Sequence, residues 1–134
     1  MSSAFVDTSG VIALLVTSDI EHPRACAAWE LLVDEPAALV TNSYVLCETY
    51  ALLQRRYGIE RATSFRRSFE PLLEIVWIER ELHDAAIALL EARTPGGISL
   101  VDASAFVTMS RLGIDRVFGF DRHFQAAGFT FIDG

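Results

Sequence analysis

The stretch that most constrains how this chain can fold is residues 4–10, Ala-Phe-Val-Asp-Thr-Ser-Gly. A short apolar run suited to a strand ends on Asp7, three small residues follow, and a second apolar run covers residues 11–16. We interpret this order as a buried strand, a tight turn and a helix, which Thr8 or Ser9 would cap. Because open α/β sheets bind ligands at the carboxyl ends of their strands, we expect Asp7 to belong to a functional site.

The rest of the chain alternates between segments with strand-like and helix-like apolar spacing. Further strands are expected over 38–41, 73–78, 116–120 and 129–132. Helices are expected over 24–34, 43–57, 60–69, 81–93 and 99–112, with a short helical turn from 121. Such alternation predicts an α/β fold, with a central parallel sheet of about five strands flanked by helices, in one domain covering residues 1–134.

Local signals fix several of these boundaries. Asn42 or Ser43 is expected to cap the long third helix, and Gly58 suits the position after its end. Pro95 and the two glycines after it are expected to separate the last two long helices.

The absence of lysine excludes several functions. The net charge is -7, and all 11 basic residues are arginine. The chain therefore lacks a P-loop lysine, a Schiff-base lysine and a lysine partner for a phosphorylated aspartate. The negative charge disfavours unspecific binding of nucleic acid over the whole surface and favours a basic partner or a metal.

Cysteine, histidine and hydropathy patterns point to an intracellular protein. Two cysteines form no disulfide framework, and three scattered histidines form no zinc pattern. No apolar stretch is long enough to span a bilayer, and the N-terminus lacks the layout of a signal peptide. We therefore expect a cytoplasmic location and no membrane contact.

Four acids are candidate site residues, and each has a simpler alternative. Asp7 could belong to a turn, and Asp121, at the end of the fourth strand, could merely cap a short helix. Asp102 completes an [ST]-x-x-[DE] capping box with Ser99. Glu48 could be a surface charge, but the helix positions beside it carry Tyr44, Val45, Ala51 and Leu52, so it is expected to point inward.

Taken together, the four acids predict a metal site. Their helices begin at the same edge of a doubly wound sheet, where the carboxylates would repel one another by about 4 kcal/mol for each close pair at an effective dielectric of about 20. A hard divalent cation would neutralise them, and ligands that are all oxygen suit Mg²⁺ or Mn²⁺. Such a site is suited to metal-assisted hydrolysis of phosphodiesters.

These residues resemble those of PIN-domain ribonucleases, and specifically the VapC-type toxins of bacterial toxin–antitoxin pairs. The similarity covers essentially the whole chain. Its strongest parts are Phe5-Val-Asp-Thr-Ser, Glu48, Ser99-Leu-Val-Asp-Ala-Ser, Phe120-Asp-Arg-His-Phe and Ala127-Gly-Phe.

The resemblance implies a Mg²⁺- or Mn²⁺-dependent endoribonuclease. Asp7 and Asp102 would be the main metal ligands, and Asp121 would complete the cluster directly or through water. Glu48 would hold a water on the metal or act as the general base, and Thr8 or Ser9 would orient a carboxylate. The family also implies a homodimer and an antitoxin that blocks the acidic site; the net charge predicts a basic segment on this antitoxin.

The chain departs from the family pattern at two positions. Gly119 stands where members often carry Ser or Thr, and His123 stands where many carry a further acid. The second departure leaves open whether one or two metals bind, and whether His123 contacts substrate or is passive.

Other residues permit two interpretations. Arg55, Arg56, Arg61, Arg66 and Arg67 could follow an RNA backbone or form a solvated face. Trp29, Tyr50 and Trp77 are expected in the core rather than as stacking platforms for bases.

Two other functions compete with the ribonuclease. One is a PIN-fold binding module that has lost its activity. The other is an aspartate-based phosphotransfer protein with Asp7 as nucleophile, which the lack of lysine and the presence of Ser9 in place of a further acid disfavour.

Overall fold

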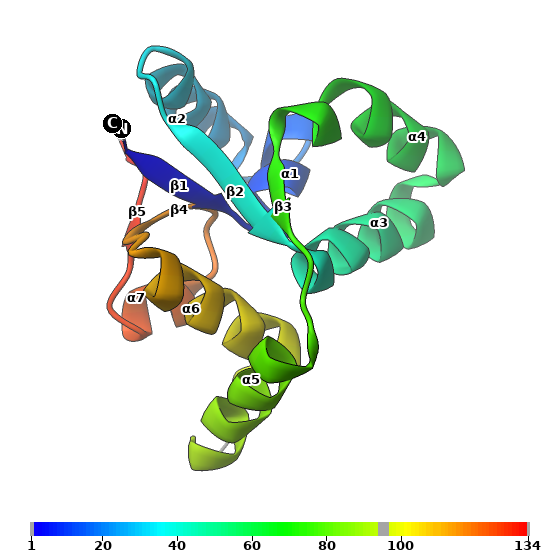
Figure 1. Cartoon of the computed structure of the whole chain (residues 1–134). Helices are drawn as coiled ribbons and strands as arrows, with labels where there is room; N and C mark the ends of the chain where they lie inside the picture. Colours follow the sequence, from blue (N-terminus) through cyan, green and yellow to red (C-terminus); the bar gives the residue numbers. More distant parts are fainter. Residues whose placement is uncertain (1, 94–96, 134) are drawn as a thin grey trace.

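The computed structural model describes residues 2–93 and 97–133 (Figure 1). Its helices are α1 (Thr8–Leu15), α2 (His22–Val33), α3 (Ser43–Tyr57), α4 (Ile59–Ser68), η1 (Glu70–Leu72, a 3-10 turn), α5 (Arg80–Ala92), α6 (Leu100–Leu112) and α7 (Arg122–Ala126). Its strands are β1 (Ser3–Val6), β2 (Ala38–Asn42), β3 (Glu74–Val76), β4 (Arg116–Phe118) and β5 (Thr130–Phe131).

The strands form one parallel sheet in the order β3-β2-β1-β4-β5. The first strand of the chain is therefore the central one, and Phe5 pairs with Val40 of β2 on one side and Val117 of β4 on the other. This arrangement confirms the predicted α/β class and places the ends of β1 and β4 side by side. Asp7 and Asp121 consequently follow neighbouring strands.

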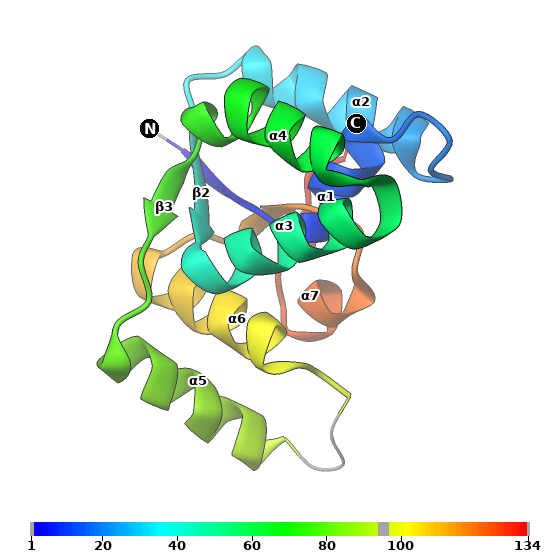
Figure 2. The same cartoon turned by 90° about the vertical axis from the view of Figure 1, so that its right-hand side faces the viewer.

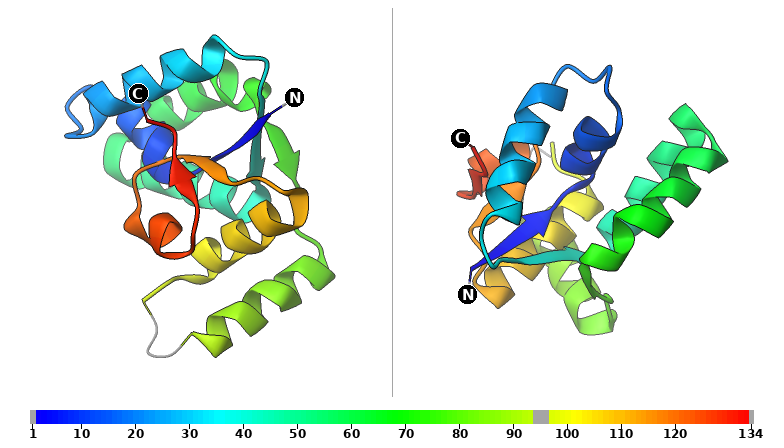
Figure 3. Two further views of the ribbon diagram at one scale, coloured as in Figure 1. Left: turned by 90° about the vertical axis from the view of Figure 1, so that its left-hand side faces the viewer. Right: turned by 90° about the horizontal axis from the view of Figure 1, so that it is seen from above.

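The central strands are buried on both faces. Ala4, Val6 and Phe118 belong to a core shared with α1, α2 and α4, whereas Phe5 and Val117 belong to a second core shared with α6 and α7. Side chains of a strand alternate between faces, so these successive apolar residues supply both cores. The result is the predicted sheet flanked by helices, arranged in three layers, and α5 packs on α6 rather than on the sheet (Figure 2). The α3–α4 pair extends away from the sheet (Figure 3).

A buried polar network around Asn42, at the end of β2, joins α3 to α6. The amide of Asn42 is fully buried, and its oxygen accepts a hydrogen bond from the Val45 N–H at 2.9 Å, which caps α3. Its nitrogen donates to the hydroxyls of Ser104 at 3.2 Å and Thr108 at 3.1 Å on α6. Because a buried amide that loses its partners is costly, this network holds α3 and α6 in one relative position.

Several boundaries differ from the prediction. The side chain of Asp7 itself caps α1 by accepting from the Ser9 N–H, whereas Thr8 and Ser9 are already helical. The cap is the residue that leaves the strand in extended conformation, which here is the acid. Pro95 and Gly96 lie outside the described residues. No helix within the described ranges combines the length and apolar character needed to cross a bilayer.

The predicted third strand is shortened to β3, and the prediction for Trp77 is wrong. Trp77 follows this edge strand and is 68% exposed, because the chain leaves the sheet there on its way to α5. Trp29 does pack in the core, 5.1 Å from Phe69 and 5.7 Å from Phe118 between ring centroids. Tyr50 packs edge-on against Phe65 at 5.2 Å.

Candidate active site

The four predicted acids line one cleft at the carboxyl edge of the sheet. This cleft has a volume of about 460 Å³. Asp7 follows β1 and Asp121 lies after β4, while Glu48 comes from α3 and Asp102 from the first turn of α6. The convergence follows from the sheet order and from the network around Asn42, which joins the two helices.

Asp7 is held by Ser9. The Asp7 carboxyl is only 6% exposed, and its Oδ2 accepts hydrogen bonds from the Ser9 hydroxyl at 2.6 Å and the Ser9 N–H at 3.2 Å. The same hydroxyl accepts from the Phe120 N–H at 2.9 Å, which ties the end of β1 to the segment after β4. Of the two residues expected to orient a carboxylate, Ser9 contacts Asp7 and the Thr8 hydroxyl interacts with Glu48. The Thr8 hydroxyl also lies 2.9 Å from that of Thr49 on α3.

The cleft concentrates negative charge. Burial raises the pKa of Asp7 from 3.8 to about 6; the Ser9 hydrogen bonds oppose this rise, and the charges of Glu48 and Asp102 add to it. Burial also raises the pKa of Glu48, with the Thr8 hydroxyl opposing and the charges of Asp102 and Asp121 adding. Burial is thus the main reason why both pKa values rise, and the like charges of neighbouring acids in the cleft add to it.

The raised pKa of Asp7 predicts how the metal-free protein responds to pH. Between pH 3.8 and about 6, folded Asp7 binds a proton that the unfolded chain has released, so stability falls as pH rises through this window. Asp7→Asn removes this dependence, and we expect it to be more stable than the wild type above pH 6 by up to roughly 3 kcal/mol.

Urea unfolding in EDTA from pH 4 to pH 8 measures this effect. The exposed Asp115 provides the matched control, since Asp115→Asn should leave the pH dependence unchanged. A loss of stability in Asp7→Asn at pH 7 would contradict the prediction.

Asp102 has two roles in the structure. Its N–H donates to the Ser99 hydroxyl at 3.1 Å, and its Oδ2 accepts from the Ser99 N–H at 3.2 Å, which forms the predicted capping box. Its side chain is 15% exposed and faces the cleft. The capping interaction therefore holds the carboxylate at the site instead of excluding it.

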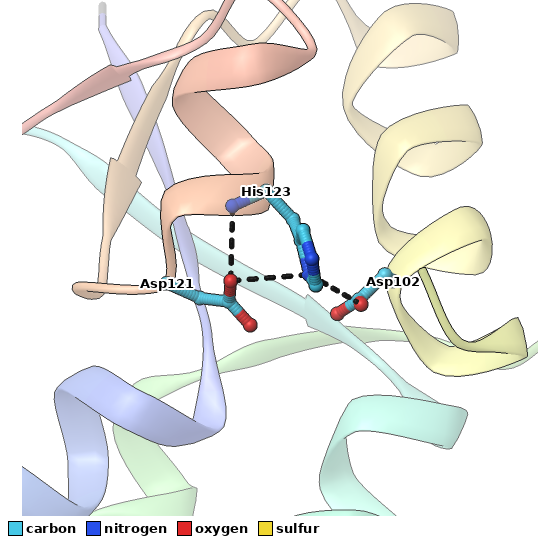
Figure 4. Close-up of side chains that lie close together, drawn as sticks. All are labelled: Asp102, Asp121 and His123. Carbon is cyan, nitrogen blue, oxygen red and sulfur yellow. Dashed lines mark hydrogen bonds and ion pairs between the residues drawn. The ribbon is translucent and has the colours of Figure 1, made fainter. Parts of the chain in front are cut away.

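Asp121 and His123 stand beside Asp102 (Figure 4). Asp121 caps α7 by accepting from the His123 N–H at 2.9 Å. Within the described residues, the side-chain atoms close enough to share one ion belong to Asp102, Asp121 and His123, all within 4.8 Å of one another. Asp7, a predicted ligand, faces the same cleft but is not part of this group of three.

Further residues line the cleft, and two of them, both acids, were not among the candidates from the sequence. Asp19 and Glu21 from the α1–α2 loop and Phe120 line it, and Arg56 is the basic side chain that lines it among the described residues. Of the five candidate arginines, Arg56 is therefore the one that lines the cleft. Arg61 instead donates a hydrogen bond to the carbonyl of Leu15 at 3.1 Å. Helix spacing would have favoured Arg55, nearly two full turns after Glu48, so no local signal identified Arg56.

The glycine at position 119 fits its surroundings. A Cβ placed there would lie 3.0 Å from the Cβ of Asp7 and 3.0 Å from the Ser9 hydroxyl. Since contacts this tight force a neighbour to move, a larger residue would disturb the link between Ser9 and Asp7. The close packing beneath Asp7 therefore leaves little room at position 119 for the Ser or Thr that family members often carry there.

Comparisons with known proteins agree with this geometry. The PIN domain family model matches residues 4–130. The chain is 32% identical over 127 residues to a protein named 23S rRNA-specific endonuclease VapC20 from two strains of Mycobacterium tuberculosis, covering 94% of this chain and 95% of the relative. The crystal structure of M. tuberculosis VapC20, titled a Sarcin-Ricin loop cleaving toxin, superimposes with a TM-score of 0.84 and covers 96% of both chains.

A more distant structure shares the fold alone. VapBC2 from Rickettsia felis, bound to a DNA fragment from its promoter, is 14% identical with a TM-score of 0.71, and the match covers 96% of each chain. The family model and the M. tuberculosis relative together extend over almost all of the sequence that forms the sheet and the cleft. The chain therefore belongs to the PIN-domain family and is of the VapC type.

Proposed function

We propose that this protein is a divalent-metal-dependent endoribonuclease that hydrolyses RNA phosphodiester bonds and acts as the toxin of a toxin–antitoxin pair. The observation that carries the proposal is the convergence of Asp7, Glu48, Asp102 and Asp121 on one cleft. The relative named as a 23S rRNA endonuclease, 32% identical over 94% of this chain, supports RNA as the substrate class.

The donor set fits a hard divalent cation. Four carboxylates line the cleft, and burial together with neighbouring charge disfavours ionisation of Asp7 and Glu48 unless a cation is near. Oxygen-rich sites of this kind bind Mg²⁺ or Mn²⁺. When bound, such an ion would neutralise the carboxylates, polarise a phosphate oxygen and lower the pKa of a water.

The chain's own residues have separate tasks in this proposal. Asp102 and Asp121 would hold the cation, and Asp7, which faces the same cleft outside their group, would contribute directly or through water. Glu48 is the general base, since its raised pKa brings it closer to neutral pH, where it can accept a proton from the attacking water. Arg56 binds a phosphate of the RNA at the edge of the cleft and offsets part of the repulsion between a polyanion and an acidic site.

Cleavage of RNA tests the proposal. Purified protein is incubated with total cellular RNA, and then with 23S rRNA, in Mg²⁺, in Mn²⁺ and in EDTA. We expect discrete products that require metal and disappear in Asp7→Asn, while Asp115→Asn cleaves as the wild type does. Cleavage that survives both EDTA and Asp7→Asn would overturn the assigned mechanism.

The same preparations distinguish the competing functions. An inactive binding module would bind RNA but would not cleave it in Mg²⁺ or in Mn²⁺, even where titration shows that the protein binds the metal. A phosphotransfer protein would incorporate phosphate from a small phosphodonor onto Asp7, with no product from RNA.

We also propose an antitoxin that covers the cleft with a basic segment, and a homodimeric toxin. The acidic lining of the cleft and the net charge of -7 support the first part, because arginine or lysine side chains would neutralise the carboxylates. The homodimer rests on the family resemblance.

A further inference from the structure

His123 stands between two of the acids at the edge of the cleft. Its ring nitrogen Nδ1 lies 3.2 Å from Oδ2 of Asp102 and 3.2 Å from Oδ1 of Asp121. Figure 4 shows the ring extending from α7 toward α6, with both carboxylates directed at it. The His123 side chain is 41% exposed, so an ion can reach this position from solvent.

The two carboxylate oxygens are fixed by helix ends. Oδ2 of Asp102 accepts from the Ser99 N–H in the capping box of α6, and Oδ1 of Asp121 accepts from the His123 N–H at the start of α7. These hydrogen bonds come from backbone N–H groups, so neither carboxylate depends on the His123 side chain to hold its position. The positions of the two carboxylates are therefore set by the ends of α6 and α7.

The spacing matches neighbouring positions around an octahedral ion. Ligands about 2.1 Å from the metal and at right angles are about 3.0 Å apart, close to the two observed separations of 3.2 Å. All three atoms lie within 4.8 Å of one another, so one ion could be held by all of them.

The charges favour a cation at this point. In the described part of the chain, the ion pairs of Asp102 and Asp121 are those with His123, and no arginine competes for them. Two carboxylate oxygens and one imidazole nitrogen thus meet at a single point beside the cleft, and a divalent cation there would neutralise both acids.

We propose that His123 is a nitrogen ligand of the divalent cation, shared with Asp102 and Asp121, and that it biases the site toward Mn²⁺ over Mg²⁺. The inference rests on the proposed function, from which it takes the cation. Imidazole suits the transition metals, whereas Mg²⁺ prefers oxygen ligands alone. A PIN-domain cleft with a carboxylate at this position would lack that bias.

Pulsed electron paramagnetic resonance on the Mn²⁺-loaded full chain tests the ligand directly. We expect a nitrogen hyperfine coupling in the wild type that is absent in His123→Asp, which still binds Mn²⁺ through oxygen. The matched control is His83→Asn, because His83 hydrogen-bonds Tyr44 on another helix and should leave the coupling unchanged.

Calorimetric titration measures the bias without any reaction. Mn²⁺ affinity should fall by at least roughly 10–100-fold in His123→Ala, because removing a ligand costs no less than removing a residue that only orients one. The preference for Mn²⁺ over Mg²⁺ should fall in His123→Asp.

The outcomes separate this inference from the proposed function. Tight Mn²⁺ binding with no nitrogen coupling would overturn the role of His123 while metal-dependent RNA cleavage stands. A coupling that persists in His123→Asp would likewise overturn it. Failure of wild-type protein to bind Mn²⁺ or Mg²⁺ would overturn both.

Discussion

Asp102→Asn is expected to lower the rate of RNA cleavage by roughly 10³-fold. In the proposed mechanism Asp102 is a ligand of the cation, and losing the contribution of a correctly held metal costs roughly 4 kcal/mol of transition-state stabilisation. The asparagine keeps an oxygen that can accept from the Ser99 N–H, so the geometry of the capping box is retained. Loss of the negative charge at the start of α6 should cost only about 0.3–1 kcal/mol of stability. Single-turnover cleavage and urea unfolding measure the two effects.

Ser99→Ala separates the cap from the charge. It removes the hydroxyl that accepts from the Asp102 N–H and should cost about 1 kcal/mol of stability, but the carboxylate remains and most of the cleavage with it. If Ser99→Ala lost as much activity as Asp102→Asn, then the position of α6 rather than the carboxylate charge would control the rate. That result would contradict the assignment of Asp102 as a ligand.

Gly10→Ala should destabilise the protein by about 3 kcal/mol, an effect comparable to a badly overpacked core. A Cβ on Gly10 would lie 2.4 Å from the carbonyl oxygen of Phe118 and 2.7 Å from its ring atom Cδ2. This carbonyl also accepts the hydrogen bond from the Asp7 N–H at 3.0 Å. Since backbone atoms cannot rotate away, α1 would have to move off β4, and Asp7 would move with it. Thermal and urea unfolding of both forms measure the loss.

Gly113→Ala is the matched glycine variant. Gly113 ends α6 in the left-handed conformation, with φ of 69°, and a Cβ there meets nothing within 4 Å. It should therefore cost only about 1–2 kcal/mol, the strain of a left-handed alanine. Equal losses in the two variants would show that the close approach of α1 to β4 is not the cause.

Much of the fold could be predicted because its signals are local. The strands and helices follow from apolar spacing, and the caps at Asn42 and Ser99 follow from residue type. The positions of Asp7 and Asp121 follow from a general property of parallel sheets, whose strand ends meet at one edge. Glu48 was found because a charged residue stood among apolar neighbours.

The remaining features depend on tertiary contacts that no local pattern encodes. Trp77 has the composition of a strand residue, but its exposure is set by where the chain leaves the sheet. The contact of His123 with Asp102 joins α7 to α6, whose relative placement depends on packing around Phe106 and Phe124. The cap of α1 shifted to Asp7 because that residue both ends the strand and starts the helix.

Because β1 lies in the middle of the sheet, the cleft beside it can be completed only late in synthesis. Although β1 is made first, its partner β4 is made near the end, as the pairing of Phe5 with Val117 shows. A ribosome that has translated only as far as α5 has produced Asp7 and Glu48 but neither Asp102 nor Asp121. A nascent or prematurely terminated chain therefore lacks half of the acidic cleft, so we expect no metal-dependent cleavage of RNA before Asp121 has been translated.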